Sequence, residues 1–293
     1  MKDSDSRVIR EFNDRGLIWL LESKSNLRDL VRILSEGIAE SLDFERAERT
    51  IRSFILDDLY KHEADMMFRV PYLHGEGEAI IYLLIEHQTV PDRTMGLRFL
   101  SYMIALWQEQ ERDWRELPSP RPTFMLNQII PILLYTREEA RNTPIGLDNL
   151  MDIPAGLEDF VPKYPILSLR LRDVSTEELT RTGTALSWIL NTLKYSKAPF
   201  AVISQKLGQP AKELEKLPEE QKIEWFRAIH FLYLLIRHKW VKSERTPLYE
   251  QVSRAIPIHL RKEMTDIILT DSEELVLEGK EFGRQEGKLE GWR

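Results

Sequence analysis

Two acidic residues, Asp65 and Glu86, lie at the outer ends of two apolar segments that a glycine-rich turn joins. The first segment reads Asp-Met-Met-Phe-Arg-Val from position 65, and the second runs from position 80 to a terminal Glu-His-Gln at 86–88. Gly75 and Gly77 between them suit a tight hairpin. A loop of two or four residues centred there predicts that Asp65 lies directly opposite Glu86.

That register would bring two carboxylates together, because cross-strand neighbours have Cβ atoms roughly 5 Å apart. Like charges at this distance repel each other unless a cation or a proton lies between them. Hard divalent cations bind one or two carboxylates and complete their shell with water and phosphate oxygens. Such a site can activate water and stabilise the charge of a phosphodiester transition state. The spacing therefore indicates Mg²⁺, or Mn²⁺, held by Asp65 and Glu86.

The residues that follow Glu86 add polar groups to this candidate site. Side chains alternate along a strand, so Gln88 shares a face with Glu86, and His87 points to the other face. Gln88 could orient the attacking water or hold a phosphate oxygen, and His87 could act as a general base. In a plainer alternative, these residues are only the solvated polar ends of two strands. Pro71 cannot donate a ladder hydrogen bond, and a bulge there would shift the pairing by one residue.

The residues around the hairpin resemble a known family. Glu-His-Gln at 86–88, followed by Asp92, Met95, Arg98 and Tyr102, is similar to the most specific block of the Rpn family. These are recombination-promoting nucleases of the PD-(D/E)XK superfamily, long labelled YhgA-like transposases. The segments at 13–16, 62–65 and 130–135 are similar too, and the likeness covers residues 1 to about 170.

The resemblance implies a PD-(D/E)XK-like α/β fold, with Asp65 and Glu86 as metal ligands and hydrolysis of DNA by metal-activated water. Gln88 stands where the superfamily usually has lysine, and a neutral amide cannot supply the positive charge that steadies a developing oxyanion. The Rpn pattern itself carries this glutamine. Asp14 or Glu22, on an early helix, could supply a third acidic group.

Arg93 and Arg98, beside the hairpin, are the candidates for contact with the DNA backbone. The net charge of −7 argues against nonspecific coating of duplex DNA, but a local basic patch is enough for phosphate contacts. The chain therefore reads as a metal-dependent endonuclease linked to recombination or mobile DNA. The alternative is a catalytically inactive nuclease fold that serves as a DNA- or protein-interaction module. No helix-turn-helix signature or zinc-ligand spacing favours a transposase proper.

The composition bounds the class of protein. The 293 residues, 42% hydrophobic and 30% charged, can form one large or two small globular domains. The chain has no cysteine, which excludes disulfides and thiolate metal sites. No apolar run is long enough for a signal peptide or a membrane span. We therefore expect a cytoplasmic protein.

Apolar spacing predicts the elements that must position the site. Residues 14–42 should form two helices with a break at Ser25 or Asn26, and 93–114 a long helix that Asp92 caps. The prolines at 118–122 should end that helix. Strands are expected in the hairpin and at 128–135 and 166–171, which gives a mixed α/β sheet. The residues of the long helix predicted to face the core are Leu97, Leu100, Tyr102, Ile104 and Trp107.

Strand signals fade after about residue 174. We predict a nuclease domain at 1–174, a helical lobe at 175–270 and a glycine-repeat tail at 271–293. Helices should cover 176–195, 198–207, 210–215, 218–240 and 247–270, with 225–240 buried and His230 as a core histidine. Glycine recurs every fourth residue from Gly279 to Gly291. This tail is either frayed and exposed or, through close helix packing, the interface of a homodimer.

Overall fold

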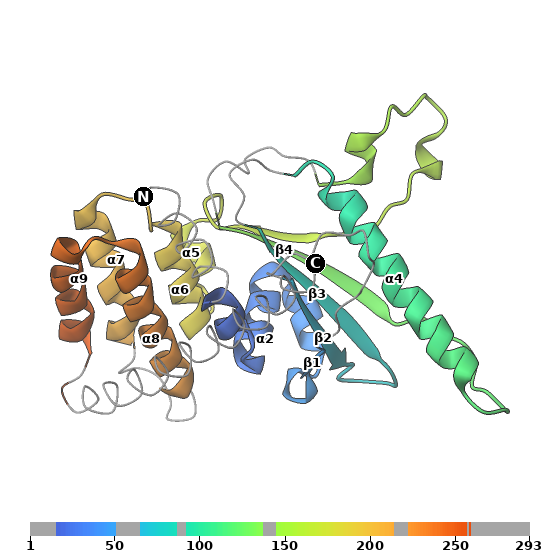
Figure 1. Ribbon diagram of the computed structural model, residues 1–293, viewed down its shortest axis with the longest axis horizontal. Helices are drawn as coiled ribbons and strands as arrows, with labels where there is room; N and C mark the ends of the chain where they lie inside the picture. The colour runs from blue at the N-terminus through green and yellow to red at the C-terminus, as the bar shows by residue number, and fades with distance from the viewer. Residues whose placement is uncertain are drawn as a thin grey trace, which may run out of the picture. The chain divides into compact units, whose positions relative to one another are not determined.

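The computed structural model describes residues 16–50, 65–86, 92–136, 145–213 and 222–256, together with residue 258. The chain divides into two compact units, Met1–Lys194 and Tyr195–Arg293. We call these the α/β unit and the helical unit. Figure 1 shows the helices and strands of both.

A five-stranded sheet, in the order β1-β2-β3-β4-β5, forms the centre of the described part of the α/β unit (Figure 1). The first three strands are antiparallel neighbours, whereas β3, β4 and β5 are parallel to one another. This architecture confirms the predicted mixed α/β fold class and is consistent with a PD-(D/E)XK-like core. The strands are β1 (Glu48–Arg49), β2 (Asp65–Pro71), β3 (Glu78–Glu86), β4 (Gln128–Tyr135) and β5 (Leu167–Arg170).

The central strands β3 and β4 are buried on both faces, which explains why they read as unbroken apolar runs. Ile81 and Ile132 are fully buried on one face. Leu84 and Leu133 are buried on the other, where helix α4 (Met95–Glu116) covers the sheet. We call this second surface the α4 face. Helix α2 (Lys24–Leu34) contacts β5 and lies on the opposite side of the sheet from α4 in Figure 1.

The register of the hairpin differs from the prediction. Asp65 pairs with Leu84 rather than with Glu86, and Pro71 pairs with Glu78. The loop covers residues 72–77, so it is longer than predicted and is centred one residue earlier. Two glycines with positive φ, 97° and 100°, shape this wider loop. The pairing advances without interruption from one end to the other, so no bulge occurs at Pro71.

Helix α4 confirms the predicted long helix, but a different side of it faces the sheet. Met95, Phe99, Met103 and Leu106 are buried against the α4 face, and Phe99 lies edge-on to Tyr82 with ring centroids 5.7 Å apart. These positions follow helical spacing and form one continuous stripe.

The predicted inward positions Leu97 and Ile104 are wrong, because their side chains are 51% and 44% exposed. Tyr102 and Trp107 do pack against the core, although they are only partly buried. Apolar residues occur all round this helix, so spacing alone did not select the buried side. The helix ends at Glu116, directly before the predicted proline-rich stop.

Gly96 allows the main chain of another segment to approach the first turn of α4. A Cβ at this position would clash with the carbonyl oxygen of Ile145. We expect Gly96→Ala to lower the free energy of unfolding by roughly 1–3 kcal/mol, because a backbone carbonyl cannot rotate away as a side chain can. Gly37, in helix α3 (Glu36–Ser41), has no atom within 4 Å of such a Cβ. Gly37→Ala should raise the free energy by up to about 1 kcal/mol. Urea unfolding measures both variants, and equal values would contradict this packing.

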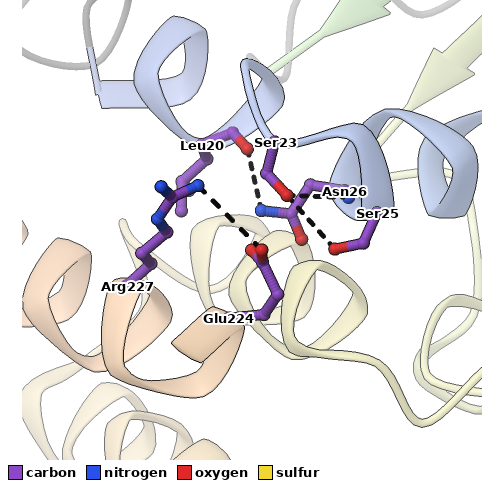
Figure 2. A network of polar contacts seen from close by, with 6 residues as sticks. All are labelled: Leu20, Ser23, Ser25, Asn26, Glu224 and Arg227. Carbon is purple, nitrogen blue, oxygen red and sulfur yellow. Dashed lines mark hydrogen bonds and ion pairs between the residues drawn. The ribbon is translucent and has the colours of Figure 1, made fainter. Parts of the chain in front are cut away.

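The early helices break earlier than predicted. Residues 16–21 are helical, and α2 begins at Lys24 after Ser23, whose hydroxyl accepts a hydrogen bond from the Asn26 N–H. The Asn26 side-chain amide donates to the Leu20 carbonyl at 2.7 Å, as Figure 2 shows. Ser23, rather than Ser25 or Asn26, therefore marks the break, because it supplies the cap of the second helix.

Two short helices after β5 belong to the α/β unit. They are α5 (Thr176–Leu179) and α6 (Ala185–Lys194), and the Ser175 hydroxyl caps α5 by accepting a hydrogen bond from the Glu178 N–H at 3.0 Å. Helix α6 contacts α2. Packing therefore groups 175–194 with the sheet, whereas the loss of strand signals predicts a boundary at 174. A change from strands to helices does not mark a new domain when the helices pack on the same core.

The helical unit contains α7 (Phe200–Glu213), α8 (Lys222–Lys239) and α9 (Lys242–Ala255) in its described part. Helix α8 confirms the predicted buried segment, and His230 is fully buried in it. Two predicted helices, 198–207 and 210–215, form the single helix α7 with Pro210 inside. Arg227 pairs with Glu224 on α8 at 3.9 Å (Figure 2).

None of the helices described is long and apolar enough to cross a membrane. The glycine-repeat tail lies outside the described residues.

His238, near the end of α8, should make the stability of the helical unit depend on pH. Burial lowers the pKa of His238 below its ordinary value of 6.5, and the charges of Arg237 and Arg245 lower it further. The unfolded chain then binds protons more tightly than the folded chain between these two pKa values. We expect the free energy of unfolding to fall as the pH drops from above 6.5 through the lowered pKa. Urea unfolding at several pH values measures this fall.

The matched variants are His238→Gln, which should remove this pH dependence, and His74→Gln, which should leave it in place because His74 is in an exposed loop. Identical pH dependence of unfolding in wild type and His238→Gln would refute the assignment.

Candidate active site

The backbone brings the two predicted metal ligands to one edge of the sheet. Strand β2 begins at Asp65, and β3 ends at Glu86. Because these strands are antiparallel, the start of one and the end of the other meet at the same edge. The parallel strands β4 and β5 also end there, with Tyr135 and Arg170. The carboxyl ends of parallel strands are where open α/β sheets commonly bind their ligands.

The register places Asp65 and Glu86 diagonally across the hairpin. Asp65 pairs with Leu84, which is two residues before Glu86. Diagonal neighbours are roughly 7–8 Å apart, which is farther than the roughly 5 Å of a directly opposed pair. A register shift of two residues preserves the face, so positions 65 and 86 both belong to the α4 face, as Leu84 does. Two hard oxygen donors at this backbone spacing fit a shared Mg²⁺ or Mn²⁺ ion.

Residues of β4 and β5 lie in line with Glu86 across the sheet, and we call these paired positions the row of Glu86. Glu86 pairs with Tyr135, and Tyr135 pairs with Arg170. The Arg170 guanidinium lies over the Tyr135 ring, 5.5 Å from its centroid, and the ring is buried. Arg170 was not among the residues predicted from the sequence. The signal that could have found it is a cation at the last position of a half-buried strand, but only the pairing of strands far apart in sequence connects it with Glu86.

Helix α4 directs its N-terminal end toward the same edge. Phe99, in its second turn, contacts Tyr82 in the middle of β3, whereas Trp107, two turns later, donates to the Asn127 carbonyl at 3.0 Å, just before the start of β4. The N-terminal end of a helix carries partial positive charge and attracts anions. The half-buried Arg98 is in this part of the helix.

Several contacts hold the start of α4 in place. The Asp92 carboxylate accepts hydrogen bonds from the Thr94 N–H at 2.8 Å and from its hydroxyl at 2.6 Å. Arg93, between these two residues, is exposed. The Tyr164 hydroxyl donates to the Gly96 carbonyl. Burial raises the pKa of Tyr164, so this hydroxyl keeps its proton at neutral pH.

Glu22 has an ion-pair partner in the structure, and three other predicted site residues lie outside the described part of the chain. Glu22 is exposed and forms an ion pair with Arg49 of β1, so a structural partner accounts for its charge. Asp14, His87 and Gln88 lie outside the described residues. Where the structure describes side chains, no three acidic or histidine residues gather into a metal-binding group. Asp65 and Glu86, which the backbone brings to one edge of the sheet, therefore remain the predicted metal ligands.

Comparison with known proteins finds relatives that match parts of this chain. The relatives found include three recombination-promoting nucleases. RpnC of Escherichia coli K12 is 30% identical over 122 residues, which cover 41% of this chain and 37% of the relative. RpnD of Escherichia coli O157:H7 is 28% identical over 109 residues, with coverages of 37% and 38%. RpnA of Escherichia coli K12 is 32% identical over 84 residues, with coverages of 28% and 25%.

The chain thus spans well under half the length of the curated relatives it matches. No solved structure matches it significantly. The family model described as "Putative transposase, YhgA-like" matches residues 13–222, which is more than half of the chain and includes the whole sheet. The resemblance seen in the Glu-His-Gln block is confirmed, and the chain belongs to this YhgA-like family.

Proposed function

We propose that the chain is a metal-dependent DNA endonuclease linked to recombination or mobile DNA. The observation that carries the proposal is the meeting of Asp65 and Glu86 at one sheet edge, where two parallel strands also end. The relatives named as recombination-promoting nucleases support it. The absence of cysteine suits the reducing cytoplasm, where we place the protein.

Asp65 and Glu86 would hold Mg²⁺ or Mn²⁺ through hard carboxylate oxygens. When bound, such an ion supplies an activated water and neutralises charge on the phosphate. Gln88, two residues beyond Glu86, orients the water or holds a phosphate oxygen through its amide. His87 is the candidate to accept a proton, and Asp14 or Glu22 to add a carboxylate; the ion pair of Glu22 with Arg49 would then have to open.

Arg98 and Arg93 contact the DNA backbone in this proposal. Arg98 is in the first turn of α4, and Arg93 lies two residues before the helix begins. Their charges add to the partial positive charge of the helix end, which favours a phosphate at that place. The protein as a whole carries −7, so binding should depend strongly on this local charge and weaken as salt increases.

Supercoiled plasmid with the purified full chain tests the proposal. Relaxed and linear products should form in Mg²⁺ or Mn²⁺ and should be absent in excess EDTA, and added Mg²⁺ should restore them. If the plasmid stays intact in both metals while the protein still binds DNA, the chain is an interaction module instead of a nuclease. Cleavage that persists in EDTA would contradict the metal requirement.

A further inference from the structure

Arg170, the last residue of β5, is fixed on the α4 face by an aromatic ring. Its guanidinium carbon lies 5.5 Å from the centroid of the Tyr135 ring. Tyr135 is only 2% exposed and belongs to the core that α4 covers, so the ring provides a rigid support. Arg170 itself is half-buried, and part of its surface is open to solvent.

Strand pairing places this cation in line with the candidate metal ligands. Glu86, Tyr135 and Arg170 are consecutive partners across β3, β4 and β5. Neighbouring strands are about 4.8 Å apart, so the backbones at Glu86 and Arg170 are separated by roughly 10 Å. An arginine side chain spans most of such a gap. A phosphate group beside an ion at Glu86 would therefore come within its reach.

The chemistry of a stacked arginine suits phosphate. Arginine binds over aromatic rings and also donates two parallel hydrogen bonds to phosphate, so one side chain can do both. Gln88 carries no charge to stabilise an oxyanion, so any protein cation in this role would have to come from elsewhere in the chain. Arg170 carries the charge that the glutamine lacks.

We propose that Arg170, positioned by Tyr135, binds a non-bridging phosphate oxygen of the DNA backbone next to the bond that is cut. The inference rests on the proposed nuclease function and extends it, because it names the residue that recognises the substrate phosphate. A merely structural arginine, which only packs on the ring or balances nearby acids, would affect stability but not DNA binding.

The salt dependence of DNA binding distinguishes these two roles. The full chain with Asp65→Asn and Glu86→Gln, which should not cut, serves as the background, and a fluorescent duplex oligonucleotide is the probe. Each phosphate contact contributes about 0.9 to the slope of log K against log [salt]. Adding Arg170→Ala should reduce the slope by about 0.9 and weaken binding by about 10- to 100-fold. Arg170→Lys should keep the slope and recover only part of the affinity.

Arg115→Ala is the matched control. Arg115 is an exposed arginine near the far end of α4, paired with Glu111 at 2.6 Å. Its replacement should leave the slope and the affinity unchanged. Arg170→Gln provides a second neutral variant with a side chain that still packs on the ring, and thermal melts identify which variants are folded.

The outcomes separate this inference from the function on which it rests. If wild type cuts plasmid but folded Arg170→Ala and Arg170→Gln match Arg115→Ala both in slope and, when each is made in the wild-type chain, in kcat/KM, Arg170 is structural and the inference is overturned. If wild type does not cut at all, the nuclease proposal fails first. A reduced slope, a lower kcat/KM and partial rescue by lysine together support phosphate binding by Arg170.

Discussion

Asp65→Asn together with Glu86→Gln should lower the rate of Mg²⁺-dependent DNA cleavage by about 10³-fold or more. Both replacements keep the size and shape of the side chain and remove the negative charge that attracts the ion. A bound metal stabilises the transition state by several kcal/mol, and each 1.36 kcal/mol is about a factor of ten in rate. Plasmid cleavage under single-turnover conditions measures the loss.

Each single variant should lose metal affinity as well, which titration calorimetry with Mn²⁺ can follow. Glu48→Gln is the control, because Glu48 is an exposed acid on the neighbouring strand β1. It should cut DNA at the wild-type rate. A double variant that cuts as fast as wild type would show that this pair of acids has no role in catalysis.

Phe99→Ala should lower the free energy of unfolding of the α/β unit by about 3–5 kcal/mol. Phe99 is 1% exposed in the contact between α4 and the sheet, and its ring is nearly perpendicular to that of Tyr82. Removing it leaves a cavity between the helix and the strands, in addition to the lost burial of apolar surface. Urea unfolding measures the change.

Leu97→Ala on the same helix is the matched control, since Leu97 is 51% exposed. Its effect should be within about 0.5 kcal/mol, as for most surface positions. A larger loss for Leu97→Ala than for Phe99→Ala would mean that α4 presents its other side to the sheet. The orientation of α4 matters for the proposed DNA contact, because Arg98 is in the first turn of the same helix.

Local sequence signals predicted the elements that form the site. Unbroken Ile and Leu runs marked β3 and β4 because central parallel strands are buried on both faces. The proline-rich stretch after Glu116 marked the end of α4, since proline cannot continue a helix. A hairpin followed by a helix and two later strands predicted a mixed α/β sheet, and the structure has one.

What local signals could not predict depends on geometry or on distant contacts. The register of the hairpin was set by a loop at 72–77 with two left-handed glycines, and a tight-turn assumption missed it by two residues. Packing against the sheet determines which side of α4 is buried. Arg170 lies in line with Glu86 only because β4 pairs in parallel with both β3 and β5, and no spacing within the sequence encodes that pairing.

The central claim is that one divalent ion joins Asp65 and Glu86 at the sheet edge, and a crystal structure of the full chain soaked in Mn²⁺ tests it most directly. We expect one anomalous scattering peak at the carboxyl end of β3, with oxygens of both carboxylates among its ligands at about 2.0–2.2 Å, as hard divalent ions require. No peak there, or two carboxylates directed away from each other, would contradict the account.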